Sequence, residues 1–328
     1  MTEPWISLHA FHRGGTDRLI TQAVGGLLRS LTADGLLVRH FFLRYWEGGP
    51  HVRLRLRPAA RPDEVEARAR AALERHLAAY PSSHEADWDA GKYAAAAERF
   101  ARAENLTHYD RRVRTRDTVE AVAYRPEYAT YGGPEAIDAV EEHFCDSSRI
   151  ALALLDGGIE PGRRVGFAAA ALMLALAAWE PDLARLARAL DASRERWDPR
   201  PDHAPHDRPT DAARGGRERA ALTAQLLRCH RIASGVEIPG ARDPLGAWWR
   251  SIDTLRLRAL DLQAAGRFHP EPAVSSFQPP GVTRARGDVL ILLLRCVHLL
   301  CNRLGLPGEQ ETHLRHLVGT TYRELEHR

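Results

Sequence analysis

Lysine and cysteine are both scarce in this sequence of 328 residues. Lys92 is the single lysine, so arginine carries nearly all of the fixed positive charge. The 46 basic residues almost balance the 43 acidic ones, and the net charge of +3 predicts no nucleic-acid partner. The cysteines are Cys145, Cys229, Cys296 and Cys301; none belongs to a C-x-x-C pair, so neither a zinc site nor a disulfide framework is indicated.

Long hydrophobic runs are also missing. The longest, residues 167–179 and 289–301, are shorter than the roughly 20 residues that cross a bilayer, and they predict buried helices. The first residues contain no basic segment followed by an apolar one, so no signal peptide is expected. These absences predict a cytoplasmic protein without a membrane partner.

Nucleotide-binding and hydrolase motifs are absent. The sequence has no Walker A loop, no G-x-G-x-x-G, no G-x-S-x-G and no H-E-x-x-H, so it gives no support to a nucleotide-driven or zinc mechanism. His203 and His206 lie in a stretch rich in proline and charge, residues 197–216, which predicts a loop and no regular metal-ligand spacing. We therefore expect no cofactor and no metal.

The order of the predicted elements indicates the fold class. Strands are expected at 5–10, 36–46 and 51–57, and helices at 16–31 and 62–79. This β-α-β-β-α order predicts an α+β fold with an N-terminal antiparallel sheet and a mostly helical remainder. Further helices are expected at 88–105, 134–144, 149–155, 162–179, 181–196, 217–234, 244–265, 289–304 and 308–325, whereas residues 107–122 have no clear pattern. We expect a single unit over 1–328, with a sheet portion (1–80), a helical portion (81–328) and loops near 197–216 and 268–286.

Residues 41–57 predict a hairpin whose turn is Glu47-Gly48-Gly49-Pro50. In its second strand the side chains alternate, so that one face receives Val52, Leu54 and Leu56 and the other receives Arg53, Arg55 and Arg57. Such a row of guanidinium groups suits carboxylates or a peptide. The alternative is an edge strand whose arginines are solvated and discourage aggregation.

Two other segments have side chains suited to chemistry. In residues 124–133 the hydroxyls of Tyr124 and Tyr131 and the carboxylate of Glu127 lie beside a Gly-Gly bend, although that bend could simply end a segment. Further on, Arg295, His298 and Asn302 follow the i, i+3, i+7 spacing of one helix face. We expect burial there to lower the pKa of His298 and keep the ring neutral, near a loop that contains Ser275 and Ser276. A satisfied core histidine is the alternative.

Several motifs, taken in order, resemble one known family. They are WISLHAFH followed by a D-x-L-I helix, FFLRYWEGGPHVRLRLR, Y-x-P-E-x-x-x-Y-G-G with its downstream DSS, and HLLCNRLG followed by E-x-x-L-R. Together they resemble the C-terminal, glutamate-elimination-type domain of lantibiotic dehydratases, which also occurs alone as a thiopeptide-type bacteriocin biosynthesis protein. The resemblance covers nearly the whole chain.

The resemblance implies the maturation of a ribosomally made peptide, with its leader segment as a partner. One implied activity is a pyridine synthase that joins two dehydroalanines in a formal aza-[4+2] cycloaddition. The other is elimination of glutamate from glutamylated serine or threonine. Eliminating members usually have arginine before Y-G-G, where this sequence has Thr130. That departure, extra helical material at 88–105 and a longer loop at 268–286 favour the synthase.

The resemblance also implies where the peptide binds and which side chains act on it. It places the peptide over the arginines of the hairpin, with the helix of His298 opposite. The expected catalytic residues are His298, Tyr131, Tyr124, Glu127, Ser275, Ser276 and Glu104, and the expected substrate-binding residues are Arg44, Arg53, Arg55, Arg295, Asn302 and Arg303. The leader could add as a strand to the sheet edge. A non-catalytic subunit that delivers the precursor to other enzymes of the pathway is a third hypothesis, and a homodimer is left open.

Overall fold

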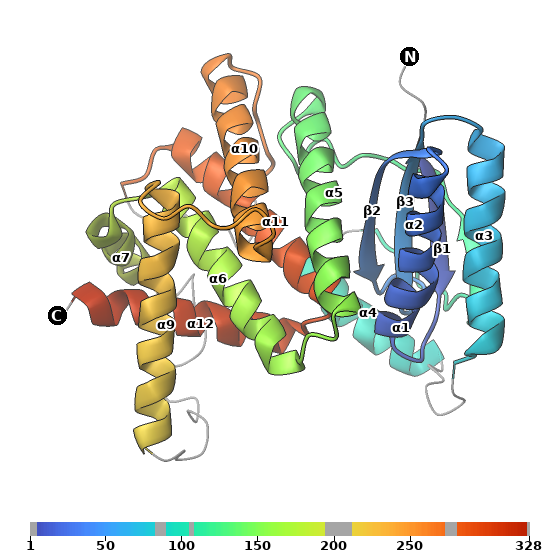
Figure 1. Cartoon of the computed structure of the whole chain (residues 1–328), viewed down its shortest axis with the longest axis horizontal. Helices are drawn as coiled ribbons and strands as arrows, with labels where there is room; N and C mark the ends of the chain where they lie inside the picture. The colour runs from blue at the N-terminus through green and yellow to red at the C-terminus, as the bar shows by residue number, and fades with distance from the viewer. Residues whose placement is uncertain (1–4, 83–89, 105–107, 194–211, 273–280, 327–328) are drawn as a thin grey trace. The chain divides into compact units, whose positions relative to one another are not determined.

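The computed structural model describes residues 5–82, 90–104, 108–193, 212–272 and 281–326. The chain divides into two compact units. Unit 1 comprises Met1–Pro126 and Ser147–Ile159, and unit 2 comprises Glu127–Asp146 and Glu160–Arg328. Strands occur in unit 1 and the described part of unit 2 is helical (Figure 1), so the predicted α+β class with an N-terminal antiparallel sheet is confirmed.

Unit 1 is built on a four-stranded antiparallel sheet with the order β2-β3-β1-β4. The strands are β1 (Ile6–Phe11), β2 (Leu37–Tyr45), β3 (His51–Pro58) and β4 (Thr118–Ala121). β3 therefore lies inside the sheet, and the alternative that it is a solvated edge strand was wrong. β4 was not predicted because its four residues are too few to show an alternating pattern; its pairing with β1 defines it.

Helices cover the apolar face of this sheet. The chain after β1 forms α1 (Thr16–Arg18), a π-helical turn η1 (Leu19–Val24) and α2 (Gly25–Ala33), which continue one another as the single predicted helix. α3 (Pro62–Ala79) and α4 (Ala90–Glu104) follow. Arg44 shares a sheet face with Val52 and pairs with Asp17 of α1, so α1 lies on the face that also buries Leu54.

The helix α5 (Pro134–Asp156) is continuous, which corrects the prediction of two helices with a cap at residues 146–148. Ser147 and Ser148 lie inside the helix and are fully buried. The hydroxyl oxygen of Ser148 accepts a hydrogen bond from the backbone N–H of Phe42 at 3.1 Å. Phe42 belongs to β2, at one edge of the sheet, so this serine satisfies an edge donor instead of a helix N-terminus.

Unit 2 packs its helices around α6 (Pro161–Trp179). The other helices are α7 (Leu183–Ala192), α9 (Ala212–Ala233), α10 (Pro244–Ala264), α11 (Arg284–Leu304) and α12 (Gly308–Glu326). Every residue of α6 from Ala168 to Trp179 is buried, which confirms it as a core helix. Among the described helices it is the one with the length and mean hydropathy of a membrane span, but 67% of that segment is buried, as in the core of a soluble protein.

Two loop predictions need adjustment. α11 begins at Arg284, five residues before the predicted start, because the side chain of Thr283 accepts a hydrogen bond from the N–H of Arg286. The predicted loop 268–286 therefore ends earlier. Of the predicted loop 197–216, residues 197–211 lie outside the described part of the chain, whereas 212–216 belong to α9.

Candidate functional site

The polar face of the sheet in unit 1 presents arginine and histidine side chains from adjacent strands. We call it the arginine face and define it by His9 of β1 and His51, Arg53, Arg55 and Arg57 of β3. The register places His9 directly opposite Arg53, and the strict alternation of β3 puts His51 on the same side as the arginines. His9, His51 and Arg55 are buried.

The guanidinium groups of the arginine face already have protein partners. Arg55 donates from Nη2 to Nε2 of His9 at 3.1 Å, and Arg53 donates from Nε to Nε2 of His51 at 3.2 Å. Arg53 also pairs with Glu47 at 3.2 Å and lies 3.4 Å above the ring of Tyr45. These arginines are therefore held in fixed orientations and are not a solvated row.

Both histidines of this face are neutral near pH 7. Burial, reinforced by the charges of Arg55, His51, Arg53 and Arg114, lowers the pKa of His9 to about 2. Burial also lowers the pKa of His51 to about 3, against the opposing effect of its hydrogen bond to the carbonyl of Gly49. The two rings stack with centroids 4.9 Å apart. The arginine face thus combines fixed cations with uncharged imidazoles.

Next to these groups lies an aromatic cluster formed by Trp5, Phe41 and Tyr124. Their ring centroids are 5.0 to 6.0 Å apart in edge-to-face arrangements. The guanidinium of Arg55 lies 5.4 Å from the centre of the Tyr124 ring. Tyr124, a predicted catalytic residue, therefore belongs to unit 1 beside the arginine face. Aromatic rings of this kind can stack against a flat heterocycle.

Four other predicted residues either lie on a different face of the sheet or fall outside the residues that the structure describes. Arg44 is on the opposite, helix-covered face, where its guanidinium bonds Thr16 and Asp17, so it does not join Arg53 and Arg55. Ser275 and Ser276 lie outside the described residues, as does the side chain of Glu104, the last residue of α4. The catalytic roles of these three stay predictions.

In unit 2 the Tyr131-Gly132-Gly133 bend holds the segment after α10. The N–H of His269 donates to the carbonyl of Gly132 at 3.0 Å, and the N–H of Glu271 donates to that of Ala129 at 2.8 Å. Arg295 donates to the carbonyls of Thr130 and Glu271, so its guanidinium ties the two segments together.

Tyr131 is buried beside this bend, and burial raises its pKa well above the usual value. Its ring packs edge-to-face on Phe144, with centroids 5.2 Å apart. Its hydroxyl is thus protonated and suited to donate a hydrogen bond. Glu127, one turn before it, is exposed.

His298 does not have the predicted burial. Its side chain is 55% exposed, and its Nδ1 lies 2.8 Å from a carboxylate oxygen of Glu311. The helix face that contains Arg295, His298 and Asn302 is not a buried polar stripe, because its neighbours leave His298 at the surface. Burial opposes ionisation of Glu311, but the hydrogen bond and charge of His298 and the charge of Arg315 outweigh it and lower the pKa of Glu311. Glu311 therefore orients the imidazole as a carboxylate partner.

Arg303 is wholly buried in unit 2, which makes it unsuited to contact a peptide directly. Its guanidinium lies 5.3 Å from the centre of the Phe144 ring. Burial lowers its pKa to about 10, while the surrounding Cys296, Tyr131 and Cys145 act in the opposite direction. Asn302, the preceding residue, is half-buried.

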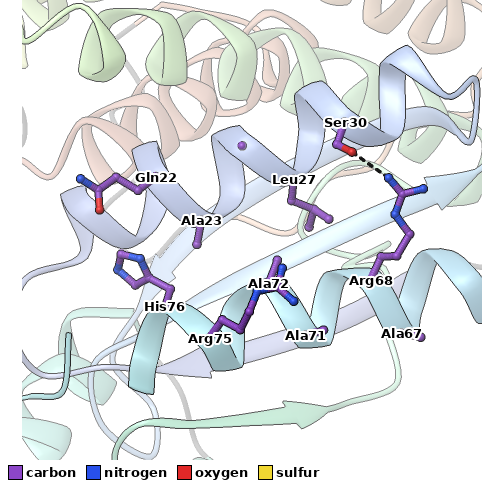
Figure 2. Close-up of a pocket in the computed structure, with 11 residues that line it drawn as sticks. Gln22, Ala23, Leu27, Ser30, Ala67, Arg68, Ala71, Ala72, Arg75 and His76 are labelled. Carbon is purple, nitrogen blue, oxygen red and sulfur yellow. Dashed lines mark hydrogen bonds between the residues drawn. The ribbon is translucent and has the colours of Figure 1, made fainter. Parts of the chain in front are cut away.

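A groove of about 630 Å³ lies in unit 1 between two helical segments, the continuous helix η1–α2 and the helix α3 (Figure 2). Small side chains leave it open, including Ala23, Ala71 and Ala72. Its polar residues are Gln22, Ser30, Arg68, Arg75 and His76, and none of the described residues that line it is acidic. His76 is 7% exposed, and its Nε2 is buried without a hydrogen-bond partner among the described residues. The groove therefore favours an apolar partner that also carries negative charge.

Sequence reasoning missed three side chains that the structure brings to these sites: His9, His51 and Glu311. A signal existed for each. His51 lies two residues before Arg53 in β3 and so points to the same face as the arginines, His9 is the first of the two histidines in WISLHAFH, and Glu311 is the glutamate of the E-x-x-L-R motif. Their partners could not be deduced because strand register and helix packing decide them. In the described ranges, no three histidine, cysteine or acidic side chains gather as metal ligands.

Comparisons with known proteins agree with this architecture. The solved pyridine synthase TbtD from thiomuracin biosynthesis aligns over 99% of both chains, with a TM-score of 0.73 and 22% identity. TsrL aligns over 98% of this chain and 95% of its own, with a TM-score of 0.64 and 16% identity. The tRNA-dependent lantibiotic dehydratase MibB from Microbispora sp. 107891 aligns with all of this chain and 28% of its own, with a TM-score of 0.51 and 20% identity. These likenesses show the fold.

Among curated proteins no match is found. The family profile described as "Lantibiotic biosynthesis dehydratase C-term" matches residues 5–322, nearly the whole chain. The chain therefore belongs to the lantibiotic biosynthesis dehydratase C-terminal family.

Proposed function

We propose that this protein is a thiopeptide pyridine synthase. It joins two dehydroalanines of an azole-containing peptide in a formal aza-[4+2] cycloaddition and then releases water and the leader peptide. The observation that carries the proposal is the state of the arginine face: Arg53 and Arg55 are held by Glu47, His51 and His9 beside an aromatic cluster. Such a surface suits a flat, polar peptide better than a glutamyl carboxylate that needs its own cation.

Three further facts support the synthase over glutamate elimination. Thr130 occupies the position where eliminating members usually have arginine, and its carbonyl is engaged by Arg295. The likeness to TbtD, named as a pyridine synthase, extends over 99% of both chains. The extra helical material at 88–105 is observed as α4, whose Tyr93 hydroxyl accepts a hydrogen bond from the N–H of Gly48 in the hairpin turn.

The proposed reaction requires one amide to become an iminol, which supplies the 2-aza-diene. The two terminal carbons of the diene then form two C–C bonds with the second dehydroalanine, and the ring nitrogen is the amide nitrogen already inside the diene. Loss of water and of the leader as a carboxamide makes the ring aromatic, and because both steps are eliminations they need no external oxidant. Holding two distant alkenes together contributes an effective molarity on the order of 10⁵ M or more.

The proposed roles follow the chemistry of each side chain. The arginines and Tyr124 hold the peptide in unit 1. In unit 2, Tyr131 donates a hydrogen bond and the His298–Glu311 pair moves protons during the eliminations. Ser275, Ser276, Glu104 and Glu127 stay candidates for the same proton transfers.

The decisive experiment is incubation with a precursor peptide that carries azoles and two dehydroalanines, followed by mass spectrometry. Release of a leader ending in a carboxamide, together with a macrocycle, supports the synthase. Conversion of a glutamylated linear peptide to dehydroalanine without cyclization would overturn it and establish glutamate elimination.

A non-catalytic recognition subunit is separated from both enzymes by two substitutions. The variants are His298→Ala and Tyr131→Phe, combined in one chain and tested for leader binding and product formation. Retained binding with lost product supports an enzyme. Unchanged output of the pathway with both residues replaced supports a subunit that only delivers the precursor.

We propose that the leader docks in the groove between α2 and α3. Part of each sheet edge is already occupied, since Ser148 bonds the N–H of Phe42 and Arg70 bonds the carbonyl of Val119, which leaves less edge for strand addition. The groove has Arg75 and His76 and no acidic lining, so it fits a leader with carboxylates beside apolar side chains. Arg75→Glu is expected to weaken leader binding about 10-fold or more, with Arg29→Glu as a control on an exposed arginine outside the groove.

A cytoplasmic location, other pathway enzymes as partners and a homodimer stay predictions.

A further inference from the structure

The two histidines of the arginine face are held in one defined tautomer. A guanidinium can only donate hydrogen bonds, so a ring nitrogen that contacts it must accept. Nε2 of His9 lies 3.1 Å from Nη2 of Arg55, and Nε2 of His51 lies 3.2 Å from Nε of Arg53. In a neutral imidazole the proton must then be on Nδ1. For His51 this agrees with the 2.9 Å contact between Nδ1 and the carbonyl oxygen of Gly49.

The two Nδ1–H groups differ in one respect. That of His51 donates to Gly49 within the turn of the hairpin. That of His9 has no hydrogen-bond partner among the described residues, where the contacts of His9 are the bond from Arg55 and its ring contacts with Phe11 and His51. His9 thus presents a donor that no described residue accepts; the residue is 7% exposed, and Nδ1 is not one of the fully buried polar atoms, so a ligand can reach it from the solvent side.

The charges around His9 keep the ring uncharged. Arg53 and Arg55 of β3 and Arg114, in the segment before β4, oppose a second positive charge there. Glu120 faces His9 from β4, but it lies 3.7 Å from Arg114 and is partly neutralised by it. A neutral donor in this setting suits a neutral oxygen acceptor. The neighbouring arginines would repel a cationic imidazole, and a substrate carboxylate would bind to the arginines in preference to His9.

We propose that His9 contacts the substrate by donating its Nδ1–H to a peptide amide oxygen, and that Arg55 is the positioning residue that fixes this tautomer. The identity of the amide rests on the proposed function: a hydrogen bond to the oxygen makes the amide N–H more acidic and assists its conversion to the iminol. The tautomer itself does not depend on any reaction, so the two parts can be tested separately.

The tautomer is tested first on the protein alone by NMR of chains labelled with ¹⁵N-histidine, with His9→Asn used to assign the His9 signals. The expected result is Nδ1–H for His9 at pH 7. Arg55→Met should increase the Nε2–H form, and Arg55→Lys, which keeps a donor, should restore Nδ1–H. An Nε2–H tautomer in the unsubstituted protein, or no change in Arg55→Met, would overturn the role of Arg55.

The contact is tested by two substitutions that move the donor. Asn at position 9 places its amide N–H near the position of Nδ1, whereas Gln places it near Nε2. With a dehydrated azole precursor, His9→Asn should retain turnover within about 10-fold and His9→Gln should lose about 100-fold, mostly in kcat. Equal turnover of the two variants, with matching circular dichroism, would remove His9 from the contact.

If the precursor is bound but not turned over, the proposed function fails while this inference can still be tested. Addition of the same precursor should then shift the Nδ1 signal of His9 more than that of His51, whose Nδ1–H is already used. Equal or absent shifts at saturating peptide would contradict the contact.

Discussion

The ring of Phe268 lies directly against Gly132, so that a β-carbon at position 132 would be 2.2 Å from its Cε2 atom. Gly132 also has a φ of 97°, which disfavours any other residue. The Y-G-G motif thus binds the segment after α10. Gly132 is required both because the ring of Phe268 approaches it closely and because of its backbone conformation. The bend therefore does more than end a segment, because it also packs against Phe268 and the segment that contains it.

Replacing Gly132 by Ala is therefore expected to destabilise unit 2 more than replacing Gly133. Gly133 has a φ of 115°, but a β-carbon there would meet only the carbonyl of Arg267 at 3.9 Å. We expect about 1–3 kcal/mol of backbone strain in both variants and about 1–3 kcal/mol of additional clash in Gly132→Ala. Urea unfolding measures both. Phe268→Ala should reduce the difference between them, and an unchanged difference would show that the ring is not the cause.

Ser148→Ala should destabilise unit 1 by about 1–3 kcal/mol, because it leaves the buried N–H of Phe42 without its acceptor. Hydrogen exchange at the Phe42 amide should accelerate, which locates the effect at the edge of β2. Ser30→Ala is the matched control: this serine accepts a bond from Arg68 at an exposed position, so its loss should change stability by less than about 0.5 kcal/mol. Equal effects of the two variants would contradict the assignment.

Stability should fall as the pH falls below about 6.5. In the unfolded chain His9 and His51 take up protons in that range, whereas in the folded protein their pKa values of about 2 and 3 keep them neutral. The unfolded state then binds more protons, and the free energy of unfolding decreases by at most about 1.4 kcal/mol per pH unit for each histidine. Urea midpoints between pH 5 and 8 measure this slope.

A matched variant isolates the contribution of His51. Asn at position 51 retains a donor for the carbonyl of Gly49 but does not titrate. His51→Asn should therefore reduce the slope of the unfolding free energy against pH by up to about 1.4 kcal/mol per pH unit, the contribution of one proton. A slope that is the same in the unsubstituted protein and in His51→Asn would show that His51 is not held neutral by the fold.

Removing the carboxylate beside His298 tests the role of that pair. Glu311→Ala should lower kcat on the order of 10²-fold with little change in KM, since it removes the group that orients the imidazole. Glu311→Gln keeps a hydrogen-bond acceptor without the charge, and we expect an intermediate loss. If both variants turn over like the unsubstituted protein, His298 acts without Glu311 or does not act at all.

The local elements could be predicted from the sequence because their patterns repeat over short distances. The alternation in residues 51–57 placed β3, Pro62 and its following acids placed the start of α3, and the apolar run at 162–179 placed the core helix α6. The motifs in order also indicated the family. The failures were local as well: β4 is too short for a pattern, and Asp146-Ser147-Ser148 has the composition of a helix cap although it lies within α5.

By itself, then, the sequence determined the α+β class, the arginine row and the family, since each is encoded in residues close together along the chain. Only the tertiary structure decided what the arginines do. His9 and Arg55 are 46 residues apart and meet because β1 pairs with β3 in one register, and burial in that sheet makes both histidines neutral. Likewise, the turn between α11 and α12 brings Glu311 to His298 and leaves the imidazole exposed. Register and burial arise from packing between distant segments, which no short pattern encodes.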